Sequence, residues 1–213
     1  MTRLAPRPLV VTDCDEVLLH MVRHFRTWLD CEHDIDFALE GNPFVQAMKR
    51  RGAEDAISEA EVFQLLGAFF DTQMGTQTPI DGAVGAITEL QKDADVVILT
   101  NLEDKRAEAR RRQLQAIGID AQVYTNQGPK GPILRDIVEN HGTSRAVFID
   151  DLAQHHRSAA ETLPMVRRLH FCGEPSISPH VPCALKAGDA HARIDNWSEA
   201  LAWLSETLHG EEK

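Results

Sequence analysis

The sequence predicts an α/β protein: a parallel sheet with flanking helices, interrupted after its first strand by a small all-helical insertion. Short apolar runs that each end in polar residues alternate with segments of helical periodicity from residue 80 onward. This alternation is typical of a parallel sheet with right-handed crossovers. Between residues 20 and 90 no strand signal occurs, and helical spacing dominates.

The first strand is predicted over Leu9–Thr12, because these residues favour a buried strand. Helical spacing then continues to about residue 30, and Gly41, Asn42 and Pro43 predict a break. Two further helices are expected over residues 44–50 and 59–72, followed by a polar linker that ends at Pro79.

The second half of the chain alternates regularly between helices and strands. The expected order is helix 81–90, strand 96–100, helix 103–117, strand 121–125, helix 130–140, strand 146–150, helix 153–161, strand 165–171 and a terminal helix over 196–208. The segment 172–192 between the last two elements is rich in Pro, Gly and His and has no clear period.

The charge balance limits the partners of this protein. With 33 acidic and 22 basic residues, the formal net charge is −11. Nucleic acid and anionic membranes select basic surfaces, so neither is an expected partner. An anionic substrate would need local cations or a metal ion in order to bind.

The four cysteines show neither CxxC pairing nor zinc-like spacing. Free thiols are typical of a reducing compartment, so we expect a cytoplasmic protein. No apolar stretch approaches the length of a membrane span.

Three predicted strands end in polar groups that can do chemistry. Because carboxyl ends of parallel strands meet at one edge of the sheet, residues distant in the sequence are expected to share one crevice there. These residues are Asp13 and Asp15, Thr100 and Asn101, and Asp150 and Asp151. Carboxylates that are crowded together repel each other unless a cation or a shared proton compensates, so a metal site is predicted.

This set supports phosphoryl transfer. Asp13 can attack phosphorus to form an aspartyl-phosphate, and Asp15 can protonate the leaving oxygen and then activate water. Mg²⁺ would bridge Asp13 and a phosphate oxygen, with Asp150 or Asp151 completing its all-oxygen site. Thr100 can hydrogen-bond a phosphoryl oxygen. Lys130, at a predicted loop-to-helix junction, supplies the cation.

Four motifs resemble those of the haloacid dehalogenase-like superfamily of phosphatases. They are DCDEVL at residues 13–18, VVILTN at 96–101, GPKGP around Lys130 and VFIDD at 147–151. The resemblance implies a Rossmann-like core formed by residues 1–19 and 79–213, and a helical cap formed by residues 20–78. It also implies Mg²⁺ as cofactor, with the backbone carbonyl of Asp15 among the metal ligands.

The resemblance assigns roles to individual residues of this chain. Asp13 and Asp15 would be catalytic, and Thr100, Asn101 and Lys130 would bind the substrate phosphate. The metal ligands would be Asp13, Asp15, Asp150 and Asp151. Family phosphatases commonly have Gly and Thr after the second acid, whereas this chain has Glu16 and Val17, and His155 stands where Asn or Asp is frequent.

Other polar residues have simpler interpretations. His20 and His24 are spaced for one helix face, and no third metal ligand is evident beside them. The basic residues between Lys105 and Arg112 are expected to form a solvated outer face. At least one residue of the pair His155 and His156 is expected on a solvated helix face, and Cys14 is expected to fill space in the core.

The sequence thus predicts a Mg²⁺-dependent phosphomonoester hydrolase that acts on a small phosphorylated metabolite through an aspartyl-phosphate. A phosphomutase that uses the same intermediate is one alternative. A catalytically silent relative that binds phosphate or a partner protein is another. The substrate and the oligomeric state stay open.

Overall fold

The computed structural model describes residues 6–39 and 43–210. Six strands form one sheet in the order β5-β4-β1-β6-β7-β8, and every neighbouring pair is parallel. The strands are β1 (Leu9–Thr12), β4 (Asp95–Thr100), β5 (Gln122–Thr125), β6 (Ala146–Asp150), β7 (Arg167–His170) and β8 (Ala192–Arg193). The predicted α/β fold with a parallel sheet is therefore confirmed.

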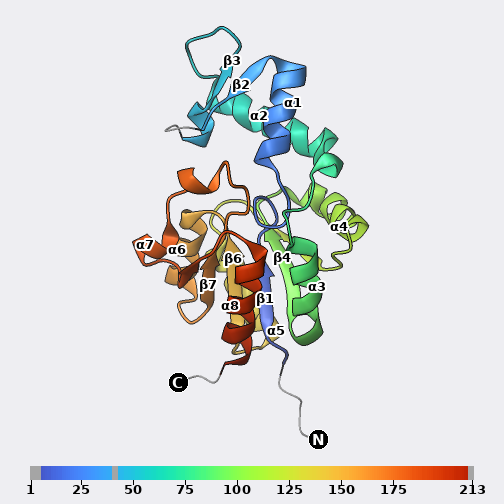
Figure 1. Cartoon of the computed structure of the whole chain (residues 1–213), viewed down its shortest axis with the longest axis vertical. Coiled ribbons are helices and arrows are strands. Elements are labelled where there is room, and N and C mark those ends of the chain that lie inside the picture. The colour runs from blue at the N-terminus through green and yellow to red at the C-terminus, as the bar shows by residue number, and fades with distance from the viewer. Residues whose placement is uncertain (1–5, 40–42, 211–213) are drawn as a thin grey trace, which may run out of the picture.

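Helices cover both faces of the sheet (Figure 1). They are α3 (Ala83–Asp93), α4 (Ala107–Ala116), α5 (Gly131–His141), α6 (Ala153–Thr162), α7 (Ala184–Ala187) and α8 (Trp197–His209). Alternate residues of a strand point to opposite faces, so Val10 packs in the apolar cluster with α3 and α8, while Leu9 and Val11 pack in the cluster with α5 and α6.

The chain between β1 and α3 forms a separate layer beyond the carboxyl ends of the strands (Figure 1). It contains α1 (Val22–His33), β2 (Ile35–Phe37), β3 (Met48–Arg50), α2 (Glu59–Thr72) and two short 3₁₀ helices at 44–46 and 74–76. Its own apolar cluster is built on aromatic rings, with Phe25 and Phe69 5.3 Å apart between centroids. Leu102, Cys172 and Ile177 of the sheet-bearing part complete that cluster.

The insertion is not all helical, and the expected helix over residues 44–50 is wrong. Strands β2 and β3 pair there as an antiparallel hairpin. Ile35, Phe37 and Met48 are buried, whereas the intervening Asp36 and Lys49 are exposed. Strands of three residues are too short for this alternation to stand out in the sequence. Part of the break predicted at residues 41–43 lies outside the described residues.

Two chain crossings join the insertion to the sheet-bearing part, and they are hydrogen-bonded to each other. The backbone N–H of His20 donates to the carbonyl of Thr78 (3.0 Å), and the N–H of Ile80 donates to the carbonyl of Leu18 (2.9 Å). The crossing that enters the insertion and the crossing that leaves it therefore run side by side at the base of the insertion. Among the described residues, no helix has the length and apolar character to cross a membrane.

Candidate active site

The predicted strand-end residues meet at one edge of the sheet. Asp13 follows β1, Thr100 ends β4 and Asp150 ends β6, and these three strands are neighbours in the sheet. The N–H of Asp13 donates to the carbonyl of Ile149 (2.8 Å), which fixes the backbone just beyond the β1 end. The sheet topology thus brings together acids that are 137 residues apart in the sequence.

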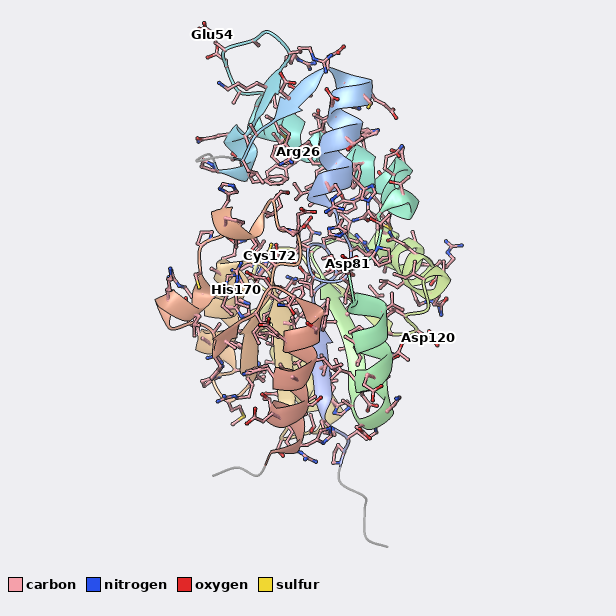
Figure 2. All side chains as sticks on the ribbon, in the orientation of Figure 1. Arg26, Glu54, Asp81, Asp120, His170 and Cys172 are labelled. Atoms are coloured by element: carbon pink, nitrogen blue, oxygen red, sulfur yellow. The ribbon has the colours of Figure 1, made fainter. Side chains whose placement is uncertain are left out.

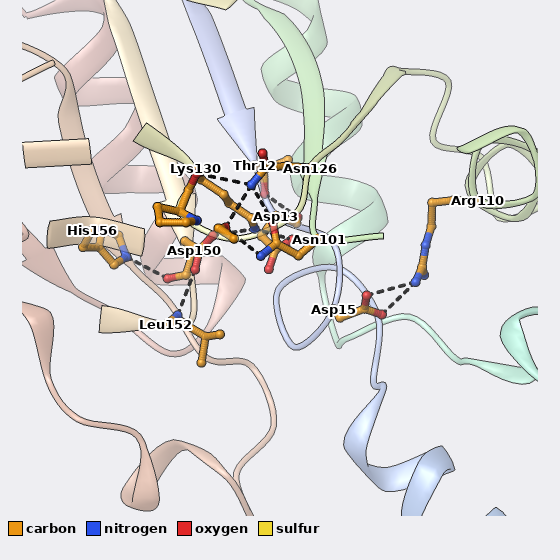
Figure 3. A network of polar contacts seen from close by, with 12 residues as sticks. Thr12, Asp13, Asp15, Asn101, Arg110, Asn126, Lys130, Asp150, Leu152 and His156 are labelled. Atoms are coloured by element: carbon orange, nitrogen blue, oxygen red, sulfur yellow. Dashed lines mark hydrogen bonds and ion pairs between the residues drawn. The ribbon is translucent and has the colours of Figure 1, made fainter. Parts of the chain in front are cut away.

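Lys130 forms the centre of this edge (Figure 3). Its Nζ lies 2.8 Å from Asp13 Oδ1 and 2.7 Å from Asp150 Oδ2. The side chain is only 1% exposed, so the two ion pairs are shielded from solvent. The carboxylates raise the pKa of Lys130 against the opposing effect of burial, so the ammonium stays charged.

Lys130 is positioned by the loop before α5. The side chain of Asn126 donates to the carbonyls of Gly128 (2.9 Å) and Pro129 (3.3 Å). The Asn101 side chain donates to the same Gly128 carbonyl at 2.9 Å and accepts from Asn126 at 3.0 Å. Asn101 therefore supports the loop that carries Lys130, a role that the sequence did not indicate. Asn126 itself was not a predicted site residue, because nothing in its local sequence distinguishes it.

Asp13, Asp150 and Asp151 form a cluster of buried carboxylates whose ligand atoms lie within 4.8 Å of one another. Among the residues that the structure describes, one ammonium, that of Lys130, faces this group, so negative charge is in excess when all three carboxyl groups are ionised. Buried charge of this kind is costly without compensation. An all-oxygen set with excess negative charge suits a hard divalent cation such as Mg²⁺. The residues present therefore fit the metal that the resemblance implied.

The three carboxyl groups differ in their pKa. Burial raises the pKa of Asp13 to about 7, although Lys130 opposes this effect. Burial, together with the charges of Asp150 and Asp13, raises the pKa of Asp151 well above its usual range. For Asp150, the effect of burial is outweighed chiefly by the charge of Lys130 and by its hydrogen bond to the carboxylate, so the pKa of Asp150 is lowered. Asp150 is thus the acid best held in its ionised form.

Asp15 lies apart from this cluster (Figure 3). Its carboxylate pairs with the guanidinium of Arg110, with Nη2 at 3.0 Å from Oδ1 and 2.9 Å from Oδ2. Gln77 also donates to Asp15 Oδ1 at 2.8 Å. Arg110 is fully buried, and its guanidinium lies 5.6 Å from the centroid of the Phe70 ring. The structure therefore brings Asp13, Lys130, Asp150 and Asp151 together and directs the Asp15 side chain elsewhere.

The expectation that the basic run from Lys105 to Arg112 forms a solvated face is wrong for two of its members. Arg110 is completely buried, and Arg106 is 7% exposed and pairs with Asp71 at 2.6 Å. Arg111 and Arg112 do face solvent and pair with Glu108 on their own helix. Partners distant in the sequence decide which arginines are buried, and helical spacing alone carries no sign of them.

The two histidines after the acidic pair are also buried, contrary to expectation. His155 is 2% exposed and His156 is 0% exposed. A ring nitrogen of His156 lies 2.9 Å from the carbonyl of Asp150. Burial lowers the pKa of both imidazoles, so both favour the neutral form. Cys14, by contrast, is buried among apolar residues as predicted.

Glu16 occupies a backbone conformation that favours glycine. Its φ is +60°, in the left-handed region. The position where family phosphatases commonly have Gly therefore does require an unusual backbone, and Glu16 adopts it. Its Oε1 accepts the N–H groups of Met21 (2.9 Å) and Val22 (2.6 Å), which begin helix α1. These hydrogen bonds to a carboxylate offset the backbone strain, which is about 1 kcal/mol.

No protein-family model matches the chain, and no curated protein matches its sequence. A haloacid dehalogenase-like hydrolase from Deinococcus radiodurans, solved with bound phosphate and sodium, is similar in structure, with a TM-score of 0.66 at 18% identity over 98% of this chain and 100% of that one.

Two further solved structures are similar. A haloacid dehalogenase-like hydrolase from Streptococcus pneumoniae has a TM-score of 0.65 at 15% identity, covering 92% of this chain and 98% of its own. An L-2-haloacid dehalogenase has a TM-score of 0.60 at 8% identity, covering 93% and 99%. The chain therefore has the fold of the haloacid dehalogenase-like hydrolases, as the resemblance of its motifs implied.

Proposed function

We propose that this protein is a haloacid dehalogenase-like hydrolase of the phosphatase type, which uses Mg²⁺ to hydrolyse a small phosphorylated metabolite. One observation carries the proposal: a buried lysine lies between two strand-end aspartates, with a third aspartate beside them. The bound phosphate in the Deinococcus structure of the same fold supports the assignment of substrate class.

In the proposed reaction, a carboxylate oxygen of Asp13 forms a bond to phosphorus, and the bond from phosphorus to the ester oxygen breaks. Lys130 favours the ionised form of Asp13 and binds a phosphoryl oxygen, while Thr100 and Asn101 contact the phosphate from the end of β4. Mg²⁺, held by Asp13, Asp150 or Asp151 and the backbone carbonyl of Asp15, would neutralise charge on the phosphoryl group.

Asp15 would donate a proton to the leaving oxygen and then accept one from the water that cleaves the aspartyl-phosphate. For this step its carboxylate must leave Arg110 and turn toward Asp13. Residues 20–78 would act as a cap that excludes water and selects the substrate. The free state of all four cysteines supports a reducing, cytoplasmic setting.

A second candidate is a catalytically silent relative that binds phosphate or a partner protein. The pairing of Asp15 with Arg110 favours this candidate, because it holds the acid away from Asp13. A phosphomutase would share the chemistry of Asp13 but would return the phosphoryl group to a sugar. The L-2-haloacid dehalogenase has the same fold, but a dehalogenase does not need an acid at Asp15, so we place this reaction last.

The test is phosphate release from a panel of phosphorylated metabolites, with Mg²⁺ or with chelator. We expect Mg²⁺-dependent release that is lost in Asp13→Asn and kept in Asp93→Asn, an exposed matched control. Interconversion of sugar phosphates with little net release would instead indicate a mutase. Halide release from 2-haloacids would indicate a dehalogenase, and no turnover of any substrate would indicate the silent binder.

A further inference from the structure

A second cluster of ligand-type side chains lies outside the candidate active site, at the base of the insertion. Glu16, His20 and Glu174 place one ligand atom each within 4.8 Å of the others, and all three residues are buried. Glu16 and His20 belong to the crossing that enters the insertion. Glu174 comes from the loop after β7, two residues beyond Cys172, which lies between the insertion and the sheet (Figure 2).

The two carboxylates of this cluster share one arrangement. In each, one oxygen is already fixed by hydrogen bonds: Glu16 Oε1 accepts the N–H groups of Met21 and Val22, and Glu174 Oε1 accepts from the N–H (3.1 Å) and Oγ (2.8 Å) of Ser176. The second oxygen of Glu16 makes no hydrogen bond within the described part of the chain, and that of Glu174 faces His20 Nδ1 and the side chain of Arg23. Metal-binding carboxylates are oriented in the same way by hydrogen bonds to their non-ligating atoms.

Among the residues that the structure describes, none of the three remaining atoms makes a hydrogen bond, and Glu16 Oε2 has no ion pair either. The Glu16 residue is only 3% exposed. His20 Nδ1 lies 3.0 Å from Glu174 Oε2, yet the two atoms do not form a hydrogen bond of acceptable geometry. Buried polar atoms are nearly always satisfied, so such a group indicates a missing partner. One bound cation would satisfy all three atoms together.

The loops that carry the cluster are fixed to each other. The N–H of Gly173 donates to the carbonyl of Glu16 at 2.7 Å. A Cβ at Gly173 would lie 2.6 Å from a side-chain carbon of Ile80, so this close approach needs glycine. The donor set is therefore largely preformed. Bonds of about 2 Å to a tetrahedral metal place ligand atoms about 3.3 Å apart. The three ligand atoms, which lie within 4.8 Å of one another, would contract to that separation on binding the ion.

We propose that Glu16, His20 and Glu174 bind a divalent transition-metal ion, most favourably Zn²⁺. This site is separate from the Mg²⁺ site at the strand ends. An imidazole with two carboxylates suits Zn²⁺, whereas Mg²⁺ prefers oxygen ligands alone. The bound ion would link the entering crossing to the loop after β7. This proposal is independent of the proposed enzymatic reaction, because none of its three residues takes part in that reaction.

One neighbouring cation opposes metal binding. Arg23 Nη2 lies 2.9 Å from Glu174 Oε2, the oxygen that faces His20. The Arg23 side chain is 53% exposed, so it can turn into solvent when an ion binds. Removing its charge should therefore strengthen Zn²⁺ binding, because like charges near a shared ligand repel each other. If Glu174 formed only an ion pair with Arg23 and no metal site were present, removing the charge of Arg23 would not strengthen Zn²⁺ binding.

The test is calorimetric titration of the chelator-treated protein with Zn²⁺ in excess Mg²⁺, repeated with Co²⁺ and followed by visible absorption. We expect one equivalent of Zn²⁺ per chain, with affinity at least about tenfold weaker in His20→Gln and in Glu174→Gln. His24→Gln is the matched control, because His24 contacts Thr78 instead and should leave binding unchanged. Arg23→Gln should bind Zn²⁺ more tightly than the wild type.

The Co²⁺ spectrum separates the two metal sites, because the strand-end aspartates supply no nitrogen ligand. The visible absorption band of Co²⁺ that depends on an imidazole nitrogen ligand should be present in the wild type and absent in His20→Gln. The proposal is overturned if the wild type binds no more Zn²⁺ than His20→Gln, or if Arg23→Gln binds it no more tightly. Should His20→Gln fail to fold, anomalous density for Zn²⁺ between Glu16 and Glu174 in a soaked wild-type crystal decides the question.

Discussion

Arg110 holds both carboxylate oxygens of Asp15, at 3.0 and 2.9 Å, although the two residues are 95 positions apart in the sequence. The guanidinium is completely buried, and the Asp15 side chain is 16% exposed. A charged nitrogen that donates to both oxygens of one carboxylate combines charge with fixed geometry. In this structure it determines where the second acid of the DCDEVL motif points.

Asp15→Asn should destabilise the protein as well as abolish the proposed activity. The substitution leaves the buried Arg110 without its counter-charge, which costs about 2 kcal/mol. Chemical denaturation measures this loss as a lower unfolding midpoint. Glu108→Gln is the control. Glu108 lies on α4 together with Arg110, and its exposed ion pair with Arg111 contributes little to the free energy of unfolding. Equal stability of Asp15→Asn and the wild type would contradict the importance of the pair.

Asp151→Asn should stabilise the protein when Mg²⁺ is absent. Burial and the neighbouring Asp150 and Asp13 raise the pKa of the Asp151 carboxyl, so its charged form is disfavoured in the fold. A neutral amide removes this repulsion, and we expect Tm in chelator to rise by about 2 °C or more. Addition of Mg²⁺ should raise Tm in the wild type but much less in Asp151→Asn.

Asp36→Asn, on the exposed side of β2, is the matched control for this experiment and should show wild-type behaviour. An equal Mg²⁺-dependent rise of Tm in Asp151→Asn and in the wild type would argue against Asp151 as part of the metal site.

Gly131→Ala should displace Lys130 without changing any charged group. A Cβ at Gly131 would lie 2.3 Å from the carbonyl oxygen of Ser158 and 2.5 Å from Thr162 Oγ1, so the start of α5 must move away from α6. We expect loss of stability and of most phosphate release. Gly85→Ala meets no atom within 4 Å and lies inside α3, so it should stabilise the protein by about 0.5–1 kcal/mol. Full activity of Gly131→Ala would contradict this account.

His191 should make stability depend on pH in the acid range. Burial and the nearby Arg168 and Arg167 lower its pKa to about 4 from the usual 6.5. Between these values the unfolded chain binds more protons than the folded one, so the free energy of unfolding falls as pH is lowered from 6.5 toward 4. Above pH 6.5 this contribution is fully present.

His191→Asn should reduce that slope, because Asn can still accept the N–H of Arg168, which His191 Nδ1 accepts at 3.0 Å, but does not titrate. Unfolding by urea at several pH values measures the effect. His209→Asn is the comparison, because His209 is exposed at the end of α8. An unchanged pH dependence in His191→Asn would show that other groups cause the slope.

The sequence predicted the features that short segments encode. The apolar runs before Asp13, Thr100 and Asp150 mark strands, and the topology of a parallel sheet then brings their ends to one edge. Lys130 was also recognised, because Gly128 and the prolines around it mark a loop before a helix. These residues could be predicted because their positions follow from elements that form locally.

The features that were missed depend on contacts between distant segments. Arg110 looked like part of a solvated helix face, since its partner Asp15 and the ring of Phe70 come from other elements. His20 had no visible third ligand because Glu174 lies 154 residues further along the chain. The β2–β3 hairpin is held by burial inside the insertion, and its strands are too short to give a periodic signal.

The paired crossings at the base of the insertion restrict how the upper layer can move. The hydrogen bonds between His20 and Thr78 and between Ile80 and Leu18 join the two connections into one ribbon. A ribbon bends most readily across its flat face and resists bending within its own plane. The insertion is therefore expected to tilt toward and away from Asp13. One residue added to either crossing would shift the pairing and release this restraint while leaving every side chain at the strand ends intact.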